Sequence, residues 1–257
     1  MEGKITLSRN SWLNDLAGAW IFYTILPSLP FIKPSFKRIA RFAPIIGLII
    51  GALSSSLWII FKNLNWQNEA LILINLAFYL FITGGIHLDG LIDTGDGLGA
   101  GKNRCLEAME DSRIGANGIK LLSIIIAIQI AALIRLGSNS IIALPIAYAW
   151  GRFSPLIAIS SFAYLSNKGS ASFHKKYWQN WKEFIPSTVI FIIILITNFC
   201  FDFKYQLINM FWVGFFPSIS IPFILGRRIG GHNGDSYGAC VVIVETITLF
   251  ILAFFIK

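Results

Sequence analysis

The chain has 257 residues, of which 55% are hydrophobic and only 13% are charged. A soluble domain carries about 25% charged residues, so this composition excludes an ordinary soluble protein and favours lipid as the solvent for much of the surface. The net charge is +8. In a chain this apolar, basic residues that flank membrane spans and meet anionic headgroups explain the charge better than nucleic-acid binding does.

Seven apolar stretches are candidate membrane spans, since a span needs roughly 20 mostly apolar residues. They cover residues 42–61, 69–86, 117–136, 139–165, 184–201, 206–226 and 238–256. A shorter stretch, 12–26, is predicted to be interfacial or re-entrant. No linker or change of composition divides the chain. We therefore expect one all-α polytopic membrane domain over residues 1–257, with about seven transmembrane helices and a short N-terminal helix.

Lys and Arg residues gather in alternate connecting segments. The rich segments carry Lys4, Arg9, Lys33, Lys37, Arg38 and Arg41; then Lys102, Arg104, Arg113 and Lys120; then Lys168, Lys175, Lys176 and Lys182; and lastly Arg227 and Arg228. The segments between them carry single cations, namely Lys62, Arg135, Lys204 and Lys257. Because Lys/Arg-rich loops face the cytoplasm, the alternation predicts a cytoplasmic N-terminus and an external C-terminus.

Acidic residues are concentrated directly after the stretch 69–86, in a run that we expect to continue that span. Asp89, Asp93 and Asp96 are spaced i, i+4 and i+7, which on a helix puts them on one face with neighbours about 5–6 Å apart. Three like charges at that distance repel one another unless a cation lies among them, and carboxylate oxygens suit Mg²⁺, Mn²⁺ or Ca²⁺. The run therefore predicts a metal site; the alternative is a solvated acidic loop.

Glycines interrupt the same run, and glycine is a poor helix former. The segment is therefore expected to be partly irregular, with backbone N–H groups free to approach a phosphate.

A second cluster occupies residues 226–239 and combines Arg227, Arg228 and Asp235 with several glycines. By the distribution of basic residues it lies on the same side of the membrane as the acidic run. Asp235 could add a metal ligand, and the two arginines could hold phosphate oxygens in bidentate fashion. A basic membrane flank followed by a tight turn is the alternative interpretation.

Two charged residues, Arg152 and Glu245, lie inside predicted spans. Such residues are costly in lipid and normally face a cavity or a partner. Glu245 follows Asp235 by ten residues, about 15 Å along a straight helix, so both could serve one metal only if the chain bends. A structural Arg–Glu pair is the rival hypothesis. His87 could be a metal ligand, a proton carrier or an interfacial histidine.

Three motifs resemble those of one known family, the cobalamin synthases, which are adenosylcobinamide-GDP ribazoletransferases. They are GGIHLDGLIDTGDGL at residues 84–98, MEDSRIGANG at 109–118 and RRIGGHNGDSYGA at 227–239, and the upstream PIIGLIIGAL at 44–53 also fits. Their order and spacing agree with the family over nearly the whole chain. The family's TRLP stretch is Thr24-Ile25-Leu26-Pro27 here, and no function is assigned to it.

The resemblance implies an activity. The family joins adenosylcobinamide-GDP to α-ribazole, or to its 5′-phosphate, giving adenosylcobalamin or its phosphate and releasing GMP. It requires Mg²⁺, with Mn²⁺ as a substitute, and works in a multi-pass protein of the bacterial inner membrane with its active site on the cytoplasmic side. The implied partners are these small molecules and membrane lipid, without nucleic acid; an oligomer is compatible with this interpretation.

The motifs and the chemistry together nominate the site residues. Those expected to be catalytic are Asp89, Asp93, Asp96, Asp111 and Asp235. The expected metal ligands are Asp89, Asp93, Asp96, Asp235 and Glu245. The expected substrate contacts are His87, Arg113, Arg152, Arg227, Arg228, Gly231 and Gly234.

Two other functions compete with this one. A CDP-alcohol phosphatidyltransferase also uses aspartates at helical spacing within a membrane bundle, but its motif continues with Ala-Arg after the Asp-Gly pair, and Asp89-Gly90 is not followed by Ala-Arg here. An ion transporter with an acidic intramembrane site would place its acids near the midplane. Here the acids and glycines are concentrated at the cytoplasmic end.

Overall fold

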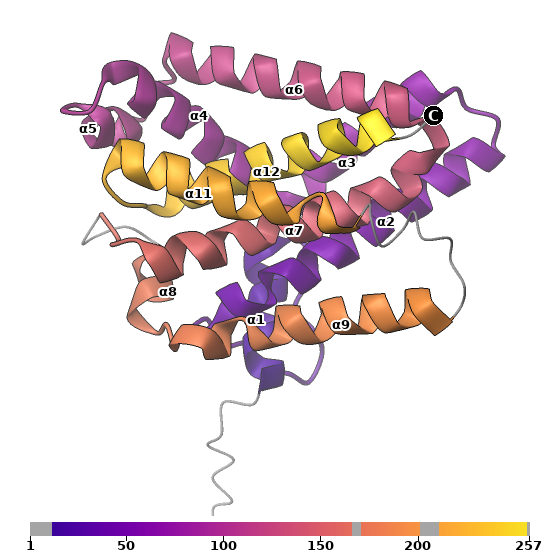
Figure 1. Ribbon diagram of the computed structural model, residues 1–257, viewed down its shortest axis with the longest axis horizontal. Helices are drawn as coiled ribbons and strands as arrows, with labels where there is room; N and C mark the ends of the chain where they lie inside the picture. Colours follow the sequence, from indigo (N-terminus) through magenta and orange to yellow (C-terminus); the bar gives the residue numbers. More distant parts are fainter. Residues whose placement is uncertain (1–11, 166–170, 201–210, 256–257) are drawn as a thin grey trace, which may run out of the picture.

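The computed structural model describes residues 12–165, 171–200 and 211–255, and it is built from helices (Figure 1). Lys4, Arg9, Lys168, Lys204 and Lys257, which contribute to the topology prediction, lie outside the described residues. The helices are α1 (Trp12–Tyr23), η1 (Ile39–Phe42), α2 (Ala43–Asn63), α3 (Asn68–Thr83), α4 (Ile86–Ala100), α5 (Cys105–Glu110), α6 (Ala116–Leu136), η2 (Gly137–Asn139), α7 (Ser140–Ser161), α8 (Ser172–Lys176), η3 (Asn180–Glu183), α9 (Ile185–Cys200), α11 (Phe215–Ile229) and α12 (Gly234–Phe255).

The all-α prediction is confirmed. Within the described ranges, the one pairing of β type is an isolated bridge between Tyr164 and His232. Helices α2, α3, α6, α7, α9, α11 and α12 overlap the seven predicted apolar stretches.

Fewer helices satisfy the length and apolarity of a membrane span. In the described part of the chain three stretches do so, namely Ile39–Asn63, Ala116–Ser161 and Gly234–Phe255, and α3 with α4 would count as a fourth if taken as one bent span. The chain is therefore membrane-like, and the number seven stays a prediction. Helix α1 has 12 residues, too few to cross a bilayer.

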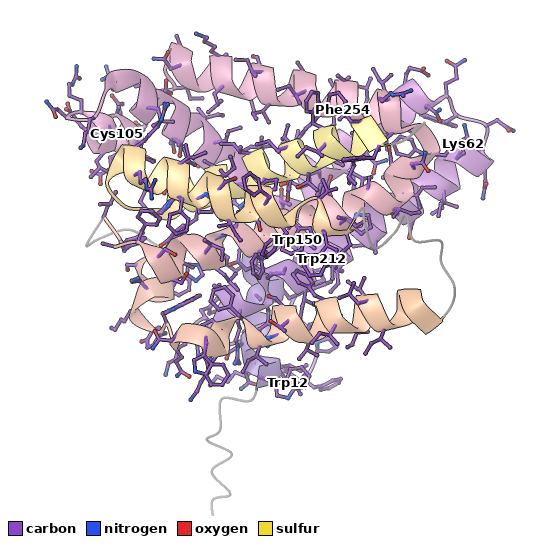
Figure 2. All side chains as sticks on the ribbon, viewed as in Figure 1. Trp12, Lys62, Cys105, Trp150, Trp212 and Phe254 are labelled. Carbon is purple, nitrogen blue, oxygen red and sulfur yellow. The ribbon has the colours of Figure 1, made fainter. Side chains whose placement is uncertain are left out.

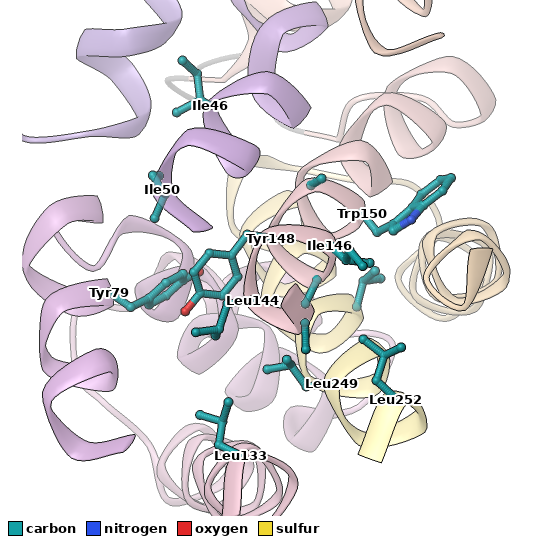
Figure 3. Packing of buried hydrophobic residues seen from close by; sticks show 14 of the residues in the cluster. Ile46, Ile50, Tyr79, Leu133, Leu144, Ile146, Tyr148, Trp150, Leu249 and Leu252 are labelled. Atoms are coloured by element: carbon teal, nitrogen blue, oxygen red, sulfur yellow. The ribbon is translucent and has the colours of Figure 1, made fainter. Parts of the chain in front are cut away.

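Helix α7 is the central element and packs against α2, α12 and α11. Figure 3 shows part of the hydrophobic cluster around it, where the ring of Tyr148 on α7 lies against that of Tyr79 on α3, with 4.9 Å between the ring centroids. Trp150, on another side of α7, donates a 2.6 Å hydrogen bond from its indole Nε1 to the carbonyl oxygen of Phe211. Because its neighbours come from distant parts of the sequence, α7 organises the bundle.

Two glycines break the chain between α3 and α4. Gly84 and Gly85 have φ angles of 62° and 74°, a left-handed conformation that glycine adopts without steric cost. The helix axes consequently meet at an angle of 93°. The acidic run therefore does not continue the preceding helix in a straight line as expected; it forms a separate helix that packs against α6 and α12 near α5 (Figure 1).

The acidic run is also a regular helix, α4, and not the partly irregular segment predicted from its glycines. The glycines let neighbouring helices approach it closely. A Cβ atom added at Gly90 would lie 2.5 Å from the backbone oxygen of Asp235 on α12, and one added at Gly95 would lie 3.0 Å from the Cα atom of Gly118 on α6. Tight packing in the folded protein offsets the low helix propensity of glycine, because small residues allow close backbone contact between helices.

We expect the substitution Gly90→Ala to lower the thermal unfolding midpoint of the purified protein in detergent. The added methyl group would overlap the backbone of Asp235, which cannot rotate away, and overpacking of this kind typically costs about 1–3 kcal/mol. Gly234→Ala, at the start of α12, is the control, since the one heavy atom that its new Cβ would approach within 4 Å is the Cβ of Ala171, at 3.2 Å. Equal midpoints for the two variants would show that the contact at Gly90 is not tight.

Candidate functional site

Carboxylates from two distant segments meet where α4 packs against α12. Asp93 lies within electrostatic range of Asp89 and Asp96 on its own helix and of Asp235 on α12. Asp235 in turn lies within electrostatic range of Asp89 and Glu110. Asp89 is exposed, whereas Asp93 and Asp235 are partly buried. The structure thus places Asp89, Asp93 and Asp235 near one another at a place open to solvent, and their roles as metal ligands stay a prediction.

A reciprocal capping arrangement holds Asp235 at the start of α12. The side-chain oxygen of Asn233 accepts a hydrogen bond from the backbone N–H of Ser236, and the Ser236 hydroxyl accepts one from the backbone N–H of Asn233, both 2.9 Å long. This is the geometry of a capping box. The Asn233 amide also donates to the Asp235 carboxylate at 3.0 Å. Asn233 and Ser236 therefore set both the first turn of α12 and the orientation of Asp235.

His232 fixes the loop that precedes this cap. Its backbone N–H donates to the Ala163 carbonyl at 3.0 Å, and its own carbonyl accepts from Leu165 at 2.8 Å. Its ring nitrogens lie 3.0 Å from the Pro222 carbonyl oxygen and the Ser236 hydroxyl. Burial lowers the pKa of His232 to about 4, so at pH 7 the ring is neutral and can donate to Pro222 while accepting from Ser236.

His232, Asn233 and Ser236 organise this region, and none of them is among the site residues predicted from the sequence. A signal was available for two of them, because Asn followed three residues later by Ser matches the spacing of a helix N-cap and its partner. The role of His232 depends on the contacts of Ala163 and Leu165, which only the folded chain reveals.

Asp96 has a different environment from the other two aspartates of α4. Its carboxylate oxygens accept hydrogen bonds from the backbone N–H groups of Gly115 and Gly118, both 2.8 Å long. These amides belong to the start of α6, where N–H groups have no partner within the helix. Asp96 therefore caps α6 from a neighbouring helix. Each of its two carboxylate oxygens uses one lone pair for this cap.

Asp111 and Arg113 bind each other between α5 and α6. The Arg113 guanidinium donates to the Asp111 carboxylate at 2.7 Å, and the Arg113 backbone N–H donates at 3.0 Å. These hydrogen bonds lower the pKa of Asp111 to about 2. The Arg113 side chain is 88% exposed. Only a substrate that lies on the protein surface could therefore contact it.

Arg152 and Glu245 form an ion pair, and both side chains are fully buried. The Arg152 guanidinium carbon also lies 5.6 Å from the ring centroids of Tyr79 and Tyr148. Since α12 is one helix from Gly234 to Phe255, Glu245 lies about 15 Å along it from Asp235. The structure therefore corrects two expectations: Glu245 does not join Asp235 in a metal site, and Arg152 is enclosed rather than open to a phosphate.

The remaining predicted residues are placed as follows. His87 is buried near Tyr23, with 6.1 Å between their ring centroids, and so faces the interior. Arg227 and Arg228 are exposed in the last turn of α11, close along the chain to Asp235. Gly231 and Gly234 belong to the loop and first turn before Asp235; at Gly231 the φ angle is 153° and a Cβ atom would overlap Ala163.

The carboxylates suit a hard divalent cation shared with a substrate. Among the described residues, no three His, Cys, Asp or Glu side chains converge closely enough to hold a metal ion by themselves. Mg²⁺ does not need such a group, because it commonly binds through one or two carboxylates, several waters and substrate phosphates. The oxygen-only chemistry of Asp89, Asp93 and Asp235, and the mutual repulsion of their charges, fit a cation of this kind.

Comparison with known proteins finds relatives over nearly the whole chain. The cobalamin-5-phosphate synthase family matches residues 15–253. Two proteins of Prochlorococcus marinus strains, both adenosylcobinamide-GDP ribazoletransferases, are 49% and 50% identical to the chain, covering 94% and 96% of it and 96% and 98% of their own lengths. A ribazoletransferase of Trichormus variabilis is 33% identical over 93% of the chain and 96% of its own length. No solved structure matches the chain.

We expect Asp96→Ala to destabilise the protein, because it removes both caps from the start of α6. Loss of an N-cap costs about 0.5–2 kcal/mol. If Asp96 were mainly a repelling member of the acidic cluster, its removal would instead raise stability, so the sign of the change in thermal midpoint separates the two roles. Glu107→Ala, which removes an exposed carboxylate 3.4 Å from Arg104, should change the midpoint little.

We expect Glu245→Gln to lower the thermal midpoint strongly, because it leaves Arg152 charged and unpaired in the core. Breaking a buried pair costs roughly 3–5 kcal/mol. Adding Arg152→Gln should recover much of that stability. A Glu245→Gln protein that keeps the wild-type midpoint but binds Mg²⁺ less tightly would contradict a structural role for the pair.

Proposed function

The chain belongs to the cobalamin-5-phosphate synthase family, and from this membership we propose that it is the transferase that joins adenosylcobinamide-GDP to α-ribazole or its 5′-phosphate. The products are adenosylcobalamin, or its 5′-phosphate, and GMP, so the enzyme acts at the last stage of cobalamin biosynthesis. The observation that carries the proposal is the family match over residues 15–253, which includes both segments that bring Asp89, Asp93 and Asp235 together.

The reaction is the transfer of a substituted phosphate group. A ribose hydroxyl of α-ribazole attacks the phosphorus that bears the cobinamide, a new P–O bond forms, and the P–O bond to GMP breaks. The hydroxyl loses a proton, and the leaving GMP takes up the negative charge. Such a reaction depends on in-line positioning of the two substrates and on neutralisation of the charge on the phosphate oxygens.

We assign the metal-binding role to Asp89, Asp93 and Asp235. When bound, Mg²⁺, or Mn²⁺ in its place, would offset charge on the diphosphate and orient it. The three carboxylates would hold such a cation at the α4–α12 contact. Asp93, beside the other two carboxylates and partly buried, is a candidate acceptor for the hydroxyl proton.

Arg227 and Arg228 supply positive charge to the same region. They end α11 just before the loop that leads to Asp235, and both are exposed. We propose that they bind the phosphate oxygens of the GDP portion directly, since an arginine guanidinium can bind phosphate in bidentate fashion.

The proposed location is the bacterial inner membrane, with several spans and with the α4–α12 contact on the cytoplasmic side. The exposed cations Lys102, Lys120, Arg227 and Arg228 occur in the segments that adjoin the carboxylates. Positive segments of this kind are retained in the cytoplasm, where nucleotide-linked substrates are available. A seven-span topology is consistent with this orientation.

The purified full-length protein should release GMP from adenosylcobinamide-GDP when α-ribazole and Mg²⁺ are both present, and EDTA should abolish the release. Asp89→Asn, Asp93→Asn and Asp235→Asn should each reduce turnover by at least about 100-fold, the loss expected when a major charge-stabilising group is removed. The measurement is GMP formation followed by chromatography at increasing Mg²⁺.

Glu107→Gln is the matched control, because this carboxylate is exposed on α5 and its one ion pair among the described residues is with Arg104. It should retain wild-type turnover. If folded Asp93→Asn protein turned over normally at saturating Mg²⁺, Asp93 would have no part in the reaction. If GMP were released without α-ribazole, the protein would be a hydrolase and the proposed transfer would be wrong.

A further inference from the structure

Two adjoining cavities lie between α1, η1 and the segment that runs from α8 to α9, on different elements from the carboxylates of α4 and α12. The first is polar, has a volume of about 650 Å³ and is lined by residues that include Asp15, Lys37, Arg38, Arg41, Lys176 and Tyr177. The second is mainly apolar, has a volume of about 530 Å³ and is lined by residues that include Phe42, Ile45, Ile185, Val189 and Ile190. Trp12, Arg38 and Arg41 belong to both linings, so the two cavities adjoin.

The polar cavity carries an excess of positive charge. Its two nearby carboxylates are each bound to an arginine: Asp15 to Arg41 and Glu183 to Arg38, both at 2.6 Å. Within the described ranges, Lys37 and Lys176 lie within salt-bridge distance of no carboxylate.

The unpaired cations are held toward the cavity by an aromatic ring. The ammonium nitrogen atoms of Lys37 and Lys176 lie 5.7 Å and 5.6 Å from the ring centroid of Tyr177, which itself lines the cavity. In addition, the Nε atom of Arg41 is buried and has no hydrogen-bond acceptor in the described part of the chain. A negatively charged oxygen in the cavity would satisfy all three groups.

The apolar cavity opens onto a helix that is poorly covered. Helix α9 lies along one edge of the molecule (Figure 1) and makes its main contacts with η1, α2 and η3. Val189 and Ile196 on α9 are 51% and 55% exposed. The mouth of the site carries the aromatic rings of Trp12 and Trp181, which are 59% and 69% exposed; tryptophan is enriched at the level of lipid headgroups.

We propose that these cavities bind one anionic phospholipid of the cytoplasmic leaflet. Its phosphate group lies in the polar cavity against Lys37, Lys176 and Arg41, and an acyl chain lies in the apolar cavity beside Ile45 and Val189. The polar cavity has unpaired positive charges, and the cavity beside it is apolar. A molecule with a negative headgroup and an apolar chain would fit both. A free phosphate would leave the apolar cavity unfilled, and a neutral lipid would leave the cations unpaired. Basic pockets between helices on the cytoplasmic side recognise such headgroups.

The lipid would also tie together parts of the chain that otherwise share few contacts. Helix α9 borders the site on one side and η1 on the other, so an occupant bridges α9 to the start of α2. We therefore expect binding to stabilise the fold, since a ligand that binds only the native state raises the unfolding midpoint.

The test uses the purified full-length protein in a neutral detergent, with phosphatidylglycerol and phosphatidylcholine of identical acyl chains as the probes. Phosphatidylglycerol should raise the thermal midpoint at lower concentration than phosphatidylcholine, and native mass spectrometry should show one retained phosphatidylglycerol. Lys37→Gln/Lys176→Gln should weaken the apparent affinity for phosphatidylglycerol by roughly 10- to 30-fold, given about 1 kcal/mol for each basic residue near an anionic headgroup.

Lys62→Gln/Arg135→Gln is the matched control, because it removes the same charge at the end of the bundle where α2 and α6 terminate. Figure 2 shows Lys62 far from Cys105, which marks the opposite end. This control should bind phosphatidylglycerol as the wild type does. Val189→Trp, which fills the apolar cavity, should weaken binding of the long-chain lipid without removing a charge.

Three results would overturn the proposal. Equal effects of the two lipids would show that the headgroup charge is not recognised. An equal rise in midpoint with inorganic phosphate would identify a free-anion site. Equal weakening in both double variants would show a response to net charge alone.

Discussion

Helix α4 can carry its carboxylates to Asp235 only because residue 90 has no side chain. The backbone of Asp235 occupies the space that a Cβ atom of Gly90 would need, with 2.5 Å between that position and the Asp235 oxygen. This contact places the acidic face of α4 beside the first turn of α12, although the two segments are separated by most of the sequence. The capping box of Asn233 and Ser236 and the loop contacts of His232 support the same geometry from the other side.

Charges in this protein occur in two contrasting environments. The core pair Arg152–Glu245 is enclosed and complementary in sign, so each charge offsets the other, and the pair links α7 to α12. The carboxylates of Asp89, Asp93 and Asp235 carry the same sign and lie near the surface. Like charges held together raise the energy of the folded chain until a cation joins them. This difference, and not the number of acidic residues, separates a structural pair from a candidate metal site.

The chemistry and the membrane contacts are assigned to different parts of the bundle. The proposed transfer site comprises α4, the end of α11 and the start of α12, whereas the proposed lipid site is formed by α1, η1, Tyr177 and α9. The two regions share α7 as a common support, since α7 packs against both α2 and α12. A lipid bound at α9 would therefore stabilise the scaffold without contacting the reacting groups.

The sequence by itself determined the all-α, membrane-like class and the identity of the acidic segment. Apolar runs of sufficient length are a local property, and the spacing of Asp89, Asp93 and Asp96 is visible without a structure. The three motifs also sufficed to indicate the family, because their order along the chain does not depend on how they pack.

The tertiary structure alone decided which charged residues share a location. Asp96 has the same spacing as its neighbours, but it caps α6, because the amides of Gly115 and Gly118 happen to lie beside it. Glu245 forms an ion pair with Arg152 and does not share a metal site with Asp235. The reason is that α12 is one helix from Gly234 to Phe255 and packs against α7, which carries Arg152. The bend at Gly84 and Gly85 contradicts the expected continuation of the stretch 69–86, and the close packing of the α4 glycines contradicts the irregularity predicted from their low helix propensity. Propensity describes an isolated segment, whereas contacts between distant segments form only when the whole chain folds.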